Sequence, residues 1–254
     1  MIDIQKATKA YNQYIQNYDI KDKKIALKVG HMLRVKENSK EIAKSLELEQ
    51  EDIDLAELIG LLHDIGRFEQ IKRYNTFIDK NSVDHGKLGV EILLKEGLIR
   101  EFIEDNQYDE IIKLAILNHN KNEIQPGLNQ REEIHAKIIR DADKLDIFNF
   151  ISFEPKEAVY ESKDVEKEMF TPQVYEDFIK TNNVDYKKIK THADILIAHF
   201  RYVYDLNYPY SINYIKEKQY VDKLYSRLKF ENLETQKQLE TIYNEAKNFL
   251  KFSL

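Results

Sequence analysis

A histidine and an aspartate, His63 and Asp64, stand side by side at the end of the hydrophobic run DIDLAELIGLL. An imidazole nitrogen and a carboxylate oxygen are both ligands of divalent metal ions. The pair also has an ordinary interpretation, in which Asp64 is a polar residue at a helix end beside a histidine of the core. The metal interpretation requires more of the sequence, because the remaining ligands of the metal must then come from elsewhere in the chain.

Further candidate ligands fall on apolar faces of other predicted helices. Residues three, four and seven apart share a face of a helix. His63 continues a stripe that includes Ile59, and His119 continues one that includes Ala115 and Ile116. A carboxylate on an apolar face is costly to bury unless it is paired or binds a cation. We therefore expect these groups to meet around cations, together with the other residues on such faces, which are His31, His85 and Asp143.

The types of donor limit the metal. Imidazole nitrogen with carboxylate oxygen and no sulfur suits Fe, Mn, Ni, Co or Zn, and Mg is tolerated on the side rich in oxygen. The chain has no Cys, so thiolate ligands and disulfides are excluded and a reducing compartment is expected.

Helices must position these residues, because helical periodicity dominates and the chain has only 7 Gly and 4 Pro. Residues 52–66 predict a helix that Gly66 ends in a left-handed turn. Residues 67–81 predict a long loop, whose aromatic residues could cover the site or anchor the loop to the core. Further helices are predicted over residues 21–48 (one or two), 82–98 with Ser82 as N-cap, 108–121, 131–151, 193–207 and 214–230.

The order His31, His63-Asp64 and Asp143 within DADKLD resembles the H…HD…D pattern of the HD superfamily of metal-dependent phosphohydrolases. The match spans about residues 25–150, and the adjacent HD after an apolar helix and the late ADKLD are each typical of the family. The resemblance implies an all-α fold, an HD-domain helical bundle with its ligands on facing helices. Helical patterns after about residue 151 predict a C-terminal helical extension.

Binuclear members of the family insert two more histidines before the last aspartate, and the chain has histidines at both places. The resemblance assigns one metal to His31, His63 and Asp143 and a second to His85 and His119, with Asp64 as the bridging ligand. Many binuclear members carry a paired HH where this chain has Asn118-His119-Asn120. Asp141 and Asp146 are rival candidates for the last ligand.

The chemistry expected of such a site is hydrolysis of a phosphate ester, plausibly of a nucleotide. Two cations about 3.5–4 Å apart can bridge a water, lower its pKa and direct the resulting hydroxide at phosphorus. Asp64 is then the catalytic residue, because it fixes the separation of the metals. The negative charge of the substrate needs basic partners, for which the candidates are Arg67, Lys144 and Arg73.

Two other functions fit the same ligands. Some binuclear iron relatives in the family activate O₂ and oxidise organic substrates, and a non-catalytic module could keep a metal site for sensing a ligand. Iron analysis with an oxygen-consumption assay separates the first alternative from the hydrolase. Bound metal without turnover of any phosphate ester would favour the second.

The whole chain sets further limits. Its 254 residues carry a net charge of −6, which argues against a nucleic-acid polymer or an anionic membrane as partner. The first residues lack the apolar block of a secretion signal, and no stretch approaches about 18 uninterrupted apolar residues. We expect a cytoplasmic protein with one domain over 1–254, in which a metal-binding core at about 22–150 carries an extension at about 151–254 packed on it. The Tyr-rich helices of this extension could form the surface of a homodimer.

Overall fold

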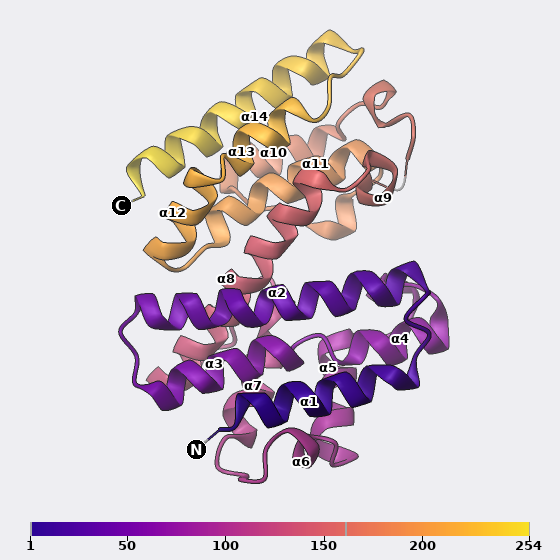
Figure 1. The fold of residues 1–254 in the computed structure, drawn as a ribbon. Coiled ribbons are helices and arrows are strands. Elements are labelled where there is room, and N and C mark those ends of the chain that lie inside the picture. The colour runs from indigo at the N-terminus through magenta and orange to yellow at the C-terminus, as the bar shows by residue number, and fades with distance from the viewer. Residues whose placement is uncertain (1, 161, 254) are drawn as a thin grey trace. The chain divides into compact units, whose positions relative to one another are not determined.

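The computed structural model describes residues 2–160 and 162–253, and all regular elements in these two ranges are helices (Figure 1). This confirms the all-α prediction. The chain divides into two compact units, Met1–Asp146 and Ile147–Leu254. The division falls close to the predicted start of the C-terminal extension at about residue 151. The packing of that extension on the core stays a prediction.

The first unit contains the elements that carry the candidate ligands. The long helices α2 and α3 pack side by side, and α1 packs on α3 (Figure 1). Helix α5 contacts both α4 and α7, and it continues into one π-helical turn over Glu91–Lys95. The helices of this unit are α1 (Ile4–Tyr14), α2 (Lys23–Ser45), α3 (Gln50–Leu62), α4 (Gly66–Tyr74), α5 (His85–Val90), α6 (Ile99–Phe102), α7 (Asp109–His119) and the first part of α8 (Gln130–Phe153).

The prediction of a loop over residues 67–81 is wrong for its first half, because α4 occupies Gly66–Tyr74. Helix α4 buries Phe68, whose ring packs against those of Tyr11 and Tyr18. Asn75, with a φ of 53°, ends the helix in the left-handed conformation that Asn tolerates. Phe68 therefore belongs to the core, which is the anchoring role that was one of the two alternatives for the aromatic residues.

Gly66 begins α4 instead of ending the preceding helix in a left-handed turn, so that prediction is also wrong. A Cβ atom at Gly66 would lie 2.4 Å from the carbonyl oxygen of His85 and 2.6 Å from the backbone nitrogen of Gly89. The glycine is required because α4 and α5 approach each other backbone to backbone at this point.

Helix α5 begins at His85, and its N-cap is Asp84 and not the predicted Ser82. The Asp84 carboxylate accepts a hydrogen bond from the backbone N–H of Lys87 at 3.2 Å. A carboxylate is a strong cap because it both accepts this bond and faces the positive end of the helix dipole. The cap places His85 at the first residue of the helix.

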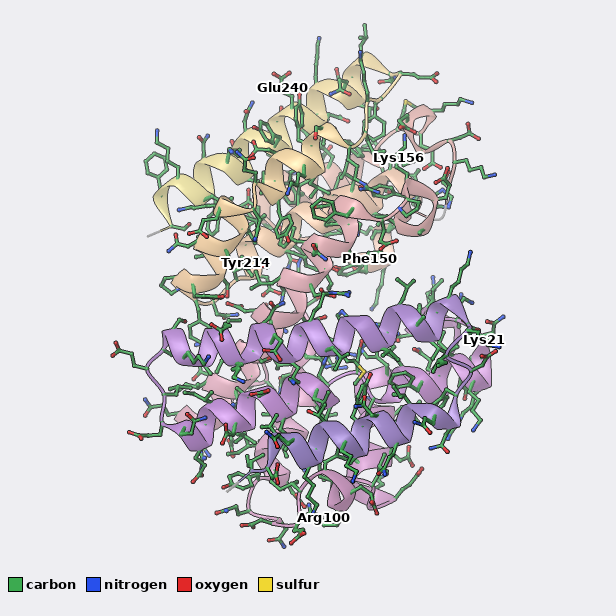
Figure 2. The ribbon with its side chains drawn as sticks, viewed as in Figure 1. Lys21, Arg100, Phe150, Lys156, Tyr214 and Glu240 are labelled. Carbon is green, nitrogen blue, oxygen red and sulfur yellow. The ribbon has the colours of Figure 1, made fainter. Side chains whose placement is uncertain are left out.

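The second unit is helical as well. Helix α8 ends in it, and the helix predicted over 214–230 is two helices that Gln219, with a φ of 54°, separates. Charged side chains such as Lys156 and Glu240 lie on its outside (Figure 2). None of the helices in the described residues is long and apolar enough to span a membrane. The remaining helices are α9 (Lys156–Tyr160), α10 (Pro172–Thr181), α11 (His192–Arg201), α12 (Pro209–Glu217), α13 (Tyr220–Ser226) and α14 (Leu233–Phe252).

Candidate metal centre

Asp64 lies at the centre of a group of four histidines from four parts of the first unit. Its Oδ2 atom is 3.6 Å from His31 Nε2 on α2 and 3.8 Å from His63 Nε2 at the end of α3. Its Oδ1 atom is 3.3 Å from His85 Nε2 on α5 and 3.5 Å from His119 Nε2 at the end of α7. The two oxygens of one carboxylate thus face two different pairs of imidazoles.

Asp143 on α8 joins the first pair. Its Oδ1 atom lies 3.2 Å from His31 Nε2 and 3.7 Å from His63 Nε2. The rival candidate Asp146 lies on the other side of the His31 ring, where its Oδ2 atom is 2.7 Å from Nδ1. Arg34 pairs with the same carboxylate, so Asp146 orients His31 from behind. The other rival candidate, Asp141, is fully buried on α8, the helix that also carries Asp143 and Asp146.

Backbone carbonyls fix the tautomers of His63 and His119. His63 Nδ1 lies 2.9 Å from the oxygen of Gly60, and His119 Nδ1 lies 2.6 Å from the oxygen of Ile116. A carbonyl oxygen only accepts hydrogen bonds, so each Nδ1 must carry the proton. In its neutral form, each imidazole then presents the lone pair of Nε2 to the centre, which is the form that binds metals.

Carboxylates hold His31 and His85 in the same orientation, with Nε2 directed at the centre. Asp146 faces Nδ1 of His31, and Asp79 Oδ2 faces Nδ1 of His85 at 2.6 Å. As a result, the Nε2 atoms of His31 and His63 are 3.2 Å apart, and those of His85 and His119 are 3.0 Å apart. Bare nitrogens at these distances repel each other unless a cation or a proton lies between them.

Burial and neighbouring charges set the ionisation of the centre. Burial lowers the pKa of His63, and it lowers the pKa of His85 to about 4, which keeps both rings neutral. Burial alone would raise the pKa of Asp64, but the positive charge of Lys28 beside it holds that pKa well below its ordinary value. The centre therefore combines the ionised carboxylate of Asp64 with the neutral imidazoles of His63 and His85.

The pKa of His31 is shifted in the opposite direction to those of His63 and His85, because both its ring nitrogens face carboxylates. Burial and the charge of Lys28 lower its pKa, but hydrogen bonds to Asp143 and Asp146 outweigh them and raise it. A cation bound at Nε2 would take the place of a proton there, so metal binding at this site releases protons.

The donor set fits divalent metal ions. His31 and His63 with Asp64, and Asp64 with His85 and His119, form two groups whose ligand atoms lie within 4.8 Å of one another. Asp64 Oδ1 is buried and has no hydrogen-bond partner among the described residues. An unpaired buried carboxylate oxygen is costly, and coordination of a cation removes that cost. Nitrogen and oxygen ligands suit the transition metals named above.

The three predicted substrate-binding residues have different surroundings. Arg67 lies at the centre, with its Nε atom 3.7 Å from Asp64 Oδ1. Arg73 lies on α4, where its Nε atom donates to Glu69 at 2.9 Å, and none of its described contacts reaches the centre. Lys144 is buried on α8, and its ammonium group donates to the backbone oxygen of Arg140 at 3.2 Å. The structure thus brings Arg67 to the centre and gives Arg73 and Lys144 other partners.

Two polar residues at the centre were not among the candidates. Lys28 Nζ lies 2.5 Å from Asp64 Oδ2, and Asp79 links His85 to Arg67. Lys28 stands three residues before His31, so helical spacing could have placed it on the same face. Asp79 lies in a short 3₁₀ turn, and nothing in its sequence neighbourhood indicates a partner.

The other three histidines have partners outside the centre. His135 pairs with Asp52 at 2.9 Å, and the exposed His192 pairs with Glu168 at 2.7 Å. The ring of His199 packs against those of Tyr160 and Tyr202 in the second unit.

The comparison with protein families agrees with this geometry. The family model of the HD domain matches residues 29–147, a range that includes all six residues of the centre. The matched range ends next to the boundary of the first unit at Asp146. No curated protein and no solved structure matches the chain. Residues 29–147 are therefore assigned to the HD domain, an all-helical domain of the metal-dependent phosphohydrolase superfamily.

Proposed function

We propose that this protein hydrolyses a phosphate ester of a small molecule, with two divalent metal ions held by His31, His63, Asp64, His85, His119 and Asp143. One observation carries the proposal. The two carboxylate oxygens of Asp64 face two separate pairs of imidazole nitrogens, at 3.3–3.8 Å. A single carboxylate between two sets of nitrogen donors is the arrangement that a bridged pair of cations needs.

When bound, two divalent metal ions would lower the pKa of water at the site and neutralise charge on the phosphoryl group. The protein supplies the geometry. Asp64 fixes the separation of the two sets of donors, and the carbonyl of Gly60 and the carboxylate of Asp146 hold two of the rings in place. Such orientation of ligands strengthens metal binding and sets its geometry.

Arg67 is the first partner proposed for the substrate. Its Nη1 atom is held by the carbonyl of Phe77 at 2.5 Å and by Asp79 at 2.9 Å. Its Nε atom is buried, has no hydrogen-bond partner in the part of the chain that the structure describes, and lies beside Asp64. A guanidinium held at one end, with a free donor at the other, suits a phosphoryl oxygen. We propose no such role for Arg73 or Lys144.

The test is a screen of the metal-loaded protein against nucleoside phosphates and simple phosphate esters. We expect release of phosphate or of a phosphorylated product from at least one of them, and loss of that turnover in Asp64→Ala. His192→Ala is the matched control, because it removes an exposed histidine of the second unit that pairs with Glu168. Full metal loading without turnover of any ester would contradict the proposal. Oxygen consumption by the iron-loaded protein would favour the oxygenase instead.

A further inference from the structure

A lysine shares the central carboxylate with the candidate metal ligands. Lys28 Nζ lies 2.5 Å from Asp64 Oδ2, the oxygen that faces His31 and His63. Its side chain is 19% exposed, against 3% for Asp64 and 0% for His63. Lys28 therefore approaches the centre from its more open side.

The ammonium group of Lys28 can donate further hydrogen bonds. It carries three N–H donors, and Asp64 is its one hydrogen-bond partner among the described residues. The Phe77 ring lies 5.4 Å from Lys28 Nζ and 5.7 Å from Arg67 Cζ, so it contacts both cations. Two positive groups thus border the centre with an aromatic ring between them.

The position of Lys28 has an electrostatic consequence. An ammonium group and a divalent cation that use the same carboxylate oxygen repel each other and compete for its charge. A phosphoryl group at the centre offers the ammonium group a second anion. Once Lys28 turns to that anion, the charge of Asp64 is left to the metal, and the two binding events strengthen each other.

We infer that Lys28 binds the phosphoryl group of the substrate, beside Arg67, and thereby couples the binding of the anion to the binding of the metal. The inference rests on the proposed function, because it assigns the anion to the same centre. Phe77 is the positioning residue, which keeps the ammonium group at the open side of Asp64.

Calorimetric titration of the full chain with Mn²⁺, with and without inorganic phosphate, tests the inference. Wild-type protein is compared with Lys28→Met and with Lys28→Arg, and Lys44→Met is the control for loss of a surface lysine on the same helix. For wild type, we expect phosphate to tighten Mn²⁺ binding by at least about fivefold. Phosphate bound directly to the metal contributes in every variant, so the difference between wild type and Lys28→Met isolates the lysine.

In Lys28→Met, Mn²⁺ should bind without phosphate at least as tightly as in wild type, and the effect of phosphate should shrink. The KM for the best ester should rise by at least about tenfold, which is the loss expected for one charged hydrogen bond, with a smaller change in kcat. Lys28→Arg should restore part of the KM because it keeps the charge.

Weaker Mn²⁺ binding by Lys28→Met without phosphate would overturn the inference, because Lys28 would then only support Asp64. The inference would also be overturned if Lys28→Met kept both the wild-type effect of phosphate on Mn²⁺ affinity and the wild-type KM. Lys28→Gln provides the same comparison if Lys28→Met does not fold. If the wild type binds Mn²⁺ but hydrolyses no ester, the proposed function fails and the phosphate titration still decides the role of Lys28. If the wild type binds no Mn²⁺, both proposals fail.

Discussion

Replacement of Gly66 by alanine should damage the metal centre although Gly66 is not a ligand. The glycine begins α4, directly after the turn that carries Asp64, and it lies against the start of α5, which carries His85. A Cβ atom there would lie 2.4 Å from the carbonyl oxygen of His85 itself. The clash is with backbone atoms, so no side chain can turn away to relieve it.

The size of the displacement follows from these distances. An ordinary contact of a Cβ atom begins at 3.4 Å, so α4 and α5 would have to move apart by up to about 1.0 Å along this contact. Metal–ligand distances tolerate only about 0.2 Å. His85 would therefore leave its place opposite Asp64 Oδ1. Forcing an extra carbon into a packed contact costs about 1–3 kcal/mol, and we expect the free energy of unfolding to fall by that amount.

Urea unfolding and metal analysis of the purified Gly66→Ala protein measure both effects. Gly89→Ala is the control, because a Cβ atom at this glycine of α5 would meet its nearest neighbour, the backbone nitrogen of Gly66, at 3.4 Å, which is an ordinary contact. Alanine in place of a glycine within a helix should raise the free energy of unfolding of this control by up to about 1 kcal/mol. The reasoning is refuted if Gly66→Ala keeps both the stability and the metal content of the wild type.

Three further outcomes are expected. Arg67→Ala should raise KM more than it lowers kcat, and unchanged steady-state kinetics would remove Arg67 from the substrate site. Asp146→Asn should weaken metal binding by about 10–100-fold, because it disturbs the orientation of His31, and an unchanged Mn²⁺ titration would contradict this role. Burial and the charge of Arg227 lower the pKa of His199 to about 3, so protonation below the unfolded value of about 6.5 favours the unfolded state. Between pH 7 and pH 5.5, the free energy of unfolding measured by urea denaturation should therefore fall by about 1 kcal/mol more in wild type than in His199→Phe. An equal fall in the two proteins would contradict this prediction.

The candidate ligands could be selected from the sequence because each lies on an apolar helical face or at a position of the family pattern. His63 and His119 end apolar helical stripes, and the H…HD…H…H…D order adds the other positions. Helical periodicity also predicted α2, α3, α7 and α8 close to their observed bounds. A polar residue on an apolar face is a strong signal, since its burial must be compensated by a partner.

The surroundings of the ligands were not predictable because tertiary contacts decide them. Gly66 resembles a helix terminator in the sequence, and its true role depends on the backbone of His85, which arrives from another helix. Lys144 follows Asp143 directly, but consecutive residues on a helix point about 100° apart, and its ammonium group donates to the backbone oxygen of Arg140. Lys28 reaches Asp64 only because α2 packs along α3.

The number of metal ions per chain tests the central claim most directly. We propose that Asp64 is shared by two metals and that His119 serves only one of them. Elemental analysis of metal-replete protein should then give two metal ions per chain for wild type, about one for His119→Ala and neither for Asp64→Ala. The same metal content in all three proteins, or loss of both metals in His119→Ala, would contradict the account.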